Sequence, residues 1–118
     1  MQIRYKSVKI KKICNDISSA KKKYDIRVAE KLIKTINFIE NAYSLKDIIS
    51  YIPFRFHDLK GDRKGTFAID LGKTLGYRLI VIPIDSDDNP CSNEQVFSEQ
   101  ACGIKIISIE EVTNHYDE

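Results

Sequence analysis

Three short segments of this chain carry side chains suited to chemistry on a phosphate. They are RFHDLKGDRKG (Arg55 to Gly65), Tyr77-Arg78-Leu79 and, near the end, Asn114-His115-Tyr116. Imidazole exchanges protons near neutral pH, arginine binds phosphate as a planar fork, and lysine binds it as a point charge. Together such groups can hold a phosphate and move protons around it without a metal, which favours a nuclease.

Metal-free cleavage of RNA needs a proton acceptor, a cation for the phosphoryl oxygens, a proton donor for the departing 5′-oxygen and a support for the unstacked nucleotide. Either His57 or His115 can serve as acid or base. Arg78 with Lys60 can hold the phosphoryl charge, and Tyr116 can stack on a base or assist proton transfer. Further candidates for RNA binding beside His57 are Arg55, Arg63 and Lys64.

Each of these side chains also has a purely structural interpretation. His57 can be a sheet-surface histidine, Arg78 can be an ion-pair partner of Asp70, and His115-Tyr116 can be a frayed tail. The cations between Lys60 and Lys64 can simply solvate a turn. Only the joint placement of these residues favours a catalytic site over the structural interpretation.

Other catalytic and metal-binding motifs are missing from the sequence. It has no HExxH or paired-carboxylate motif, no Walker loop, no GxSxG and no GxGxxG. The three cysteines, Cys14, Cys91 and Cys102, include no CxxC pair, which argues against a zinc site and a disulfide framework. Cys14 is expected to be buried on a helix, and the other two to be free thiols in a polar loop, although they could pair. We therefore expect no metal and no other cofactor.

The charges are divided between the two ends of the chain. Residues 1–34 hold eleven Lys or Arg against three acids, a net charge of +8. Residues 85–118 hold one Lys against nine acids, a net charge of −8. The basic segment favours a polyanionic partner, with Lys9, Lys12 and Lys23 as candidate RNA contacts, although an ordinary solvated helix face has the same composition.

The sequence also bears on where the protein works. Polar and charged residues crowd the first 25 positions, so no signal peptide is expected. No apolar run is long enough to cross a membrane. We therefore expect a soluble, cytoplasmic protein.

The first half of the chain has the apolar spacing of helices. After a short strand at residues 3–5, residues 10–24 are predicted to form one amphipathic helix. Asp25 then begins a second helix over residues 25–43, antiparallel to the first. Ser44 begins a short third helix that Pro53 ends.

After Pro53 the apolar period changes from 3.6 to 2, so Phe54 and Phe56 should face one way and Arg55 and His57 the other. Further strands are predicted at 66–71, 77–84 and 104–112. The acidic residues 85–103 should form an inserted loop with a short helix near 94–99.

These elements predict one α+β domain over residues 1–118. Its N-terminal helical hairpin should pack on one face of a twisted, mainly antiparallel sheet of four to five strands. The other face of the sheet is then free to carry the site.

The middle of the chain resembles a known family. The stretch from Phe56 to Gly65, followed by FAIDL at 67–71 and Tyr77-Arg78-Leu79, resembles the "LHxLKGDRxGxxxI" and "YRL" motifs of HigB-type toxins. These toxins belong to the RelE/ParE superfamily of bacterial toxin–antitoxin systems. The opening KICND at 12–16, the helical hairpin and the ending Asn-His-Tyr are similar to the branch known as plasmid-maintenance killer proteins. The resemblance covers nearly the whole chain.

The resemblance implies cleavage of mRNA in the ribosomal A site, dependent on the ribosome and independent of metal. It implies a helix-turn-helix antitoxin, similar to HigA, that neutralises the toxin, so that operator DNA is contacted only through the antitoxin. By motif position, the catalytic residues would be His57, Lys60, Arg78, His115 and Tyr116. Many HigB toxins end in Asp-Tyr-His, whereas Asn114-His115-Tyr116 is closer to the YoeB branch, so the identity of the acid stays open, and Asp117 is a further candidate.

Two other functions stay compatible with the same fold. A ParE-like toxin inhibits DNA gyrase by binding alone, and would not need the His/Lys/Arg/Tyr set. A decayed toxin would retain only antitoxin pairing and repression of its operon. The intact set of candidate catalytic residues favours the nuclease over both.

Overall fold

The computed structural model describes residues 1–72 and 74–114. The first half contains β1 (Gln2–Tyr5), α1 (Val8–Asn15), α2 (Ile17–Lys23), α3 (Ile26–Asn41), α4 (Leu45–Ser50) and the 3₁₀ turn η1 (Ile52–Phe54). The second half contains β2 (His57–Asp58), the 3₁₀ turn η2 (Gly61–Arg63), β3 (Phe67–Asp70), β4 (Tyr77–Ile84), α5 (Asn93–Val96), the 3₁₀ segment η3 (Glu99–Gly103) and β5 (Ile106–Asn114). None of the helices in the described ranges is long and apolar enough to cross a membrane.

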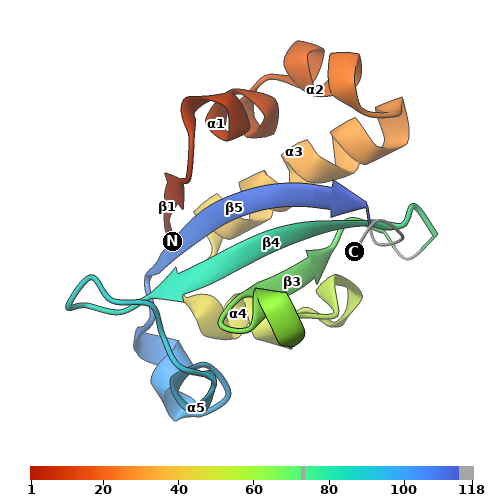
Figure 1. Cartoon of the computed structure of the whole chain (residues 1–118). Coiled ribbons are helices and arrows are strands. Elements are labelled where there is room, and N and C mark those ends of the chain that lie inside the picture. The colour runs from red at the N-terminus through yellow and green to blue at the C-terminus, as the bar shows by residue number, and fades with distance from the viewer. Residues whose placement is uncertain (73, 115–118) are drawn as a thin grey trace.

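The strands form one mixed sheet in the order β1-β5-β4-β3-β2. β1 runs parallel to β5, and every other neighbouring pair is antiparallel. Figure 1 shows α1 and α2 beyond the β5 side of the sheet, with α3 passing behind β4 and β5. The predicted α+β class, with helices packed on one face of the sheet, is therefore confirmed.

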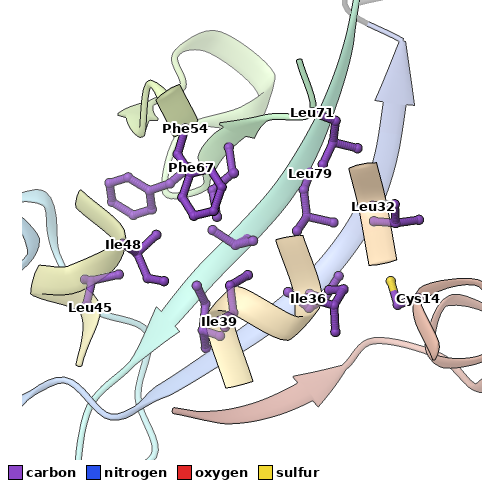
Figure 2. Close-up of a cluster of buried hydrophobic side chains, with 14 of the residues drawn as sticks. Cys14, Leu32, Ile36, Ile39, Leu45, Ile48, Phe54, Phe67, Leu71 and Leu79 are labelled. Atoms are coloured by element: carbon purple, nitrogen blue, oxygen red, sulfur yellow. The ribbon is translucent and has the colours of Figure 1, made fainter. Parts of the chain in front are cut away.

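The helix α3 anchors the sheet through one apolar stripe. Leu32, Ile36 and Ile39 are spaced four and three residues apart, so they lie on the same side of the helix, and all are almost fully buried. Figure 2 shows them pointing toward the side chains of β3 and β4. Burying side chains of this size stabilises the fold by roughly 1.5–3 kcal/mol each. The helix α3 therefore covers one face of the sheet and not the other.

The prediction of a single helix over residues 10–24 is wrong, because Asp16 divides it. The Asp16 backbone N–H donates to Lys12 O and ends α1. Its carboxylate then accepts from Ser18 N and Ser19 Oγ, which begins α2. An aspartate can bond the backbone in this way in place of continuing a helix. Asp25 caps α3 as predicted, by accepting from Arg27 N.

The predicted faces from Phe54 to His57 are confirmed, because Phe54 and Phe56 pack against the main core while Arg55 and His57 lie with Asp70 and Ala68, but the extended conformation expected there is wrong. Arg55 has a left-handed backbone conformation, with φ of 46°, and ends the turn η1. The extended chain therefore starts only at His57, and β2 is two residues long. Phe54 is nonetheless buried, while Phe56 stacks on Phe67 at 5.3 Å between ring centroids.

The inserted segment 85–103 is a folded unit, not a loop with one isolated helix. Ser92 and Gln95 form a reciprocal capping box at the start of α5. Cys91, Val96 and Ala101 are buried in the main core. All three cysteines are free thiols: Cys14 and Cys91 are buried, and Cys102 is exposed. Cys91 therefore behaves as part of the core and not of a polar loop.

Candidate functional site

The face of the sheet opposite α3, here called the outer face, is organised in cross-strand rows. One row aligns His57, Ala68, Ile80 and Glu111 on β2, β3, β4 and β5. The next row aligns Asp70, Arg78 and Thr113. His57 and Arg78 are thus on one face and two strand spacings apart, roughly 10 Å, with one row of offset.

His57 is half-buried and fixed by the backbone beside it. Its Nδ1 lies 2.6 Å from Arg55 O. A carbonyl oxygen only accepts, so Nδ1 carries the proton, and Nε2 of the neutral ring carries the lone pair. Nε2 is therefore the atom of this imidazole that can take up a proton from a substrate. The left-handed backbone of Arg55 aims its carbonyl at the ring.

Arg55 and Arg78 both lie beside Asp70. Arg55 Nη1 is 3.6 Å from Asp70 Oδ2, and the Asp70 side chain is only 13% exposed. Arg78 is half-buried and faces Asp70 directly across the β3–β4 ladder. The structural interpretation of the sequence paired Arg78 with Asp70, whereas the ion pair found at Asp70 is with Arg55. Asp70 holds one arginine in place next to the other.

The turn after β2 folds over the outer face. Leu59 packs with Ala68 and Ile80 in a small apolar cluster of its own. Arg63, in η2, forms a salt bridge with Glu111 of β5, two strands beyond β3. The fold of this turn therefore brings Arg63 over the centre of the sheet and not merely to its edge.

A β-bulge explains why Glu110 and Glu111 both occupy the outer face. Ile80 pairs with Glu111 and Val81 with Ile109, so Glu110 is an extra residue in β5. Ser108 donates to Glu110 Oε2 at 2.7 Å, which places Glu110 on the outer side with Ser108. Strict alternation would have sent one of the two glutamates into the core. No sequence signal marked this bulge, and neither glutamate was identified as a site residue.

Lys60 and Lys64 are exposed on the same turn. With Asp58, Gly61 and Gly65 they line one side of a groove whose other side is formed by Cys91, Ser92 and Asn93. Asn93 Nδ2 donates to Asp58 Oδ2 at 3.0 Å across this groove. The sequence analysis missed Asp58 and Asn93, because 35 residues separate them.

The other predicted RNA-binding lysines lie on the helices and not on the sheet. Lys9 and Lys12 are exposed on α1, and Lys23 is exposed at the end of α2. Lys9 and Lys23 line a second groove, of about 270 Å³, together with Tyr24 and Glu111. Because Glu111 also binds Arg63, this helical groove adjoins the outer face.

Two of the predicted catalytic residues, His115 and Tyr116, lie outside the described residues. The last described residue of β5 is Asn114, which pairs with Tyr77, next to the pairing of Arg78 with Thr113. Within residues 1–72 and 74–114, no three His, Cys, Asp or Glu side chains are grouped as ligands for a metal ion. Within the described residues, the candidate site thus consists of His57 and several cations. Its three arginines lie close to carboxylates: Arg55 and Arg78 to Asp70, and Arg63 to Glu111.

No protein-family model matches this chain, and no curated protein matches it either.

Proposed function

We propose that this protein is the toxin of a type II toxin–antitoxin system, an endoribonuclease that cleaves mRNA in the ribosomal A site without a metal. The observation that supports this most is the position of His57 and Arg78 on one face of the sheet, with Lys60 on the turn that follows β2. The likeness of residues 56–79 to HigB-type toxins supports the same function. A protein that acts by binding alone has no need of a proton-exchanging group beside a phosphate site.

The proposed reaction is attack of the 2′-oxygen on the adjacent phosphorus, with breakage of the bond from phosphorus to the 5′-oxygen. In this proposal His57 Nε2 takes up the 2′-hydroxyl proton, because Nδ1 already carries a proton toward Arg55 O. Arg78 and Lys60 stabilise the charge on the phosphoryl oxygens. His115 and Tyr116, the terminal catalytic pair by resemblance, are the candidates for the remaining proton transfer, and Tyr116 is the candidate for nucleotide stacking.

The proposed partners follow from the same reaction. Arg55, Arg63 and Lys64 bind the mRNA around the cut, and Lys9, Lys12 and Lys23 bind ribosomal RNA by charge. A helix-turn-helix antitoxin similar to HigA neutralises the toxin, and operator DNA is contacted only through that antitoxin. The protein acts in the cytoplasm, because ribosomes and mRNA are its substrates.

The deciding experiment adds purified protein to bacterial 70S ribosomes programmed with a defined mRNA, with an EDTA-tolerant gel readout and a control that lacks ribosomes. We expect cleavage within the A-site codon only when ribosomes are present. Arg78→Ala and His115→Ala should each lower the cleavage rate by orders of magnitude in folded protein.

Intact mRNA with correctly folded, antitoxin-free protein would contradict the proposal. A gyrase supercoiling assay would then test the ParE-like alternative. Inhibition of supercoiling by the same sample would establish action by binding.

A further inference from the structure

A groove of about 630 Å³ runs between the turn after β2 and the start of the inserted segment. This volume lies within the range of sites for small organic ligands. The two walls come from segments far apart in the sequence, Asp58 to Gly65 and Cys91 to Asn93. The insert is therefore required to form the groove.

The base of the groove is apolar. Leu59 and Cys91 both line it, and they are only 8% and 5% exposed. Leu59 also packs on Ala68 and Ile80, so this base continues into the outer face that carries His57. Cys91 is held beside the sheet because its N–H donates to Pro83 O of β4 at 2.9 Å. Apolar side chains at the base of the groove suit contact with the face of an unstacked nucleobase.

The edge of the groove carries hydrogen-bonding groups. The bond from Asn93 Nδ2 to Asp58 Oδ2, at 3.0 Å, orients both side chains. An amide has two N–H donors and an acceptor oxygen, and this bond uses one of the donors. The remaining groups of the amide match the donor and acceptor pattern on the edge of a base. Recognition of a base at this position would therefore depend on its identity.

The rim of the groove is cationic. Lys60 and Lys64 are exposed and both line it. Lysines at the rim suit a phosphate attached to a base that lies deeper. The apolar floor, the amide edge and the cationic rim together match the face of a nucleobase, its edge and the attached phosphate.

We propose that this groove binds one nucleotide of single-stranded RNA next to the cleaved phosphate, with its base on Leu59 and Cys91, its edge read by Asn93 and its phosphate held by Lys60 and Lys64. The inference rests on the proposed function and extends it, because the inserted segment then contributes to codon preference.

The first test titrates the four ribonucleoside 5′-monophosphates into ¹⁵N-labelled protein and follows backbone amide signals by NMR. Ribose 5-phosphate serves as the control without a base. We expect the signals of Leu59, Cys91 and Asn93 to shift with nucleotides, to an extent that depends on the base, and to shift less with ribose 5-phosphate. Equal shifts with ribose 5-phosphate would mean an anion site only and would overturn base recognition.

Three variants separate the parts of the site. Asn93→Ala should remove the differences among the four nucleotides. Lys64→Ala should weaken all four, and ribose 5-phosphate, by a similar factor. Asn41 is exposed, and its side chain bonds within α3. Asn41→Ala should therefore change neither the differences among the four nucleotides nor the strength of binding. If Asn93→Ala loosens the insert, as judged by its NMR spectrum, Lys64→Ala on the other wall still tests the site.

The second test compares the codons cut on 70S ribosomes by wild type and Asn93→Ala. We expect a changed codon preference, with cleavage at the codons that wild type prefers lowered toward the rate at the others. An unchanged preference, together with no base-dependent shifts, would overturn this inference and leave the proposed nuclease standing. Base-dependent shifts in a protein that cuts no mRNA would overturn the nuclease and leave the nucleotide groove standing.

Discussion

Arg78 lies at the centre of the outer face because β4 is the middle strand of the sheet. Strands on both sides align with it, so Asp70 and Thr113 flank the arginine directly. Asp70 is largely buried and also binds Arg55. This carboxylate holds Arg55 beside Arg78, which under the proposed function prepares positive charge for an incoming phosphate.

Replacement of Arg78 should therefore affect chemistry far more than folding. We expect Arg78→Ala to lower the rate of ribosome-dependent cleavage by about 10²–10³-fold, the typical loss for one charge-stabilising donor. Arg78→Lys should recover part of that loss, because lysine supplies the charge without the fork. The measurement is single-turnover cleavage, with thermal unfolding as the check on folding.

Arg27→Ala is the matched control, because Arg27 is exposed and pairs locally with Asp25 on α3. It should leave the cleavage rate unchanged. A folded Arg78→Ala protein that cuts at the wild-type rate would remove Arg78 from the catalytic site.

The cysteines show how burial controls reactivity at single residues. Burial raises the pKa of the Cys14 thiol to about 12, and burial followed by the charge of Asp85 raises the pKa of Cys91. Thiolate is the reactive form, so both should be inert in the native protein. With Ellman's reagent at neutral pH we expect one fast thiol, Cys102, and three after denaturation. Rapid reaction of the native Cys102→Ser variant would contradict the buried positions of the other two.

The raised pKa of Cys14 also predicts a loss of stability at alkaline pH. The unfolded thiol ionises near pH 8.5, whereas the folded thiol holds its proton until about pH 12. Between these values the folded state binds more protons, so stability falls as pH rises, by at most about 1.4 kcal/mol per pH unit for one group. Urea unfolding of wild type and Cys14→Ala at several pH values from 8 upward should show a shallower decline in the variant. An equal fall of stability with pH in the two proteins would mean that another group causes it. Tyr24 would be the next candidate, because burial raises its pKa to about 12.

At the scale of elements, local polar bonds decide where helices and strands change direction. Asp16 divides one amphipathic stretch into α1 and α2, and the left-handed Arg55 shortens β2 to two residues. The bulge at Glu110 lets β5 place Ile109 in the core and both glutamates on the outer face. Each of these irregularities brings polar groups to surface positions that a regular helix or strand periodicity does not predict.

Deletion of the bulge residue provides a direct test. Without Glu110, residues 109, 111 and 112 alternate regularly and keep their present faces. We expect this deletion to change the free energy of unfolding by less than about 1 kcal/mol. Deletion of Ser108 should instead cost several times that amount, because a one-residue slip turns core side chains outward. Chemical denaturation measures both, and equal losses would contradict the bulge.

At the scale of the whole molecule, the separation of charge along the chain becomes a separation in space. The basic helices α1 and α2 lie at one end of the protein, and α5 of the acidic insert lies at the other (Figure 1). A molecule charged in this way turns one end toward a polyanion before contact. The groove bordered by Lys9 and Lys23 adjoins the outer face, so RNA bound at the helices can continue toward the candidate site.

Ribosome binding should accordingly depend on salt through the basic end. We expect Lys9→Ala, Lys12→Ala and Lys23→Ala each to lower the slope of log affinity against log KCl by up to about 1. Lys46→Ala, an exposed lysine on α4, should leave that slope unchanged. Sedimentation of the protein with 70S ribosomes over a KCl series measures these slopes. Equal slopes for all variants would place the RNA contacts elsewhere.

The sequence by itself determined the class of fold, because that class depends on apolar periodicity. The stripe of α3, the strand at residues 77–84 and the burial of Cys14 all follow from which residues must leave water. It also marked the cations and the histidine of the outer face. These predictions depend on neighbours close along the chain, where spacing alone carries the information.

Only the tertiary structure decided which of those residues meet. Arg55 forms an ion pair with Asp70, Arg63 reaches across two strands to Glu111, and the insert brings Asn93 to Asp58. Each of these contacts joins residues at least 15 positions apart, and each depends on a left-handed residue, a bulge or a turn that no periodicity encodes. The physical reason is that sheet register and turn geometry are set by packing of the whole core, so the polar groups that this packing leaves outside are brought together only when the chain has folded.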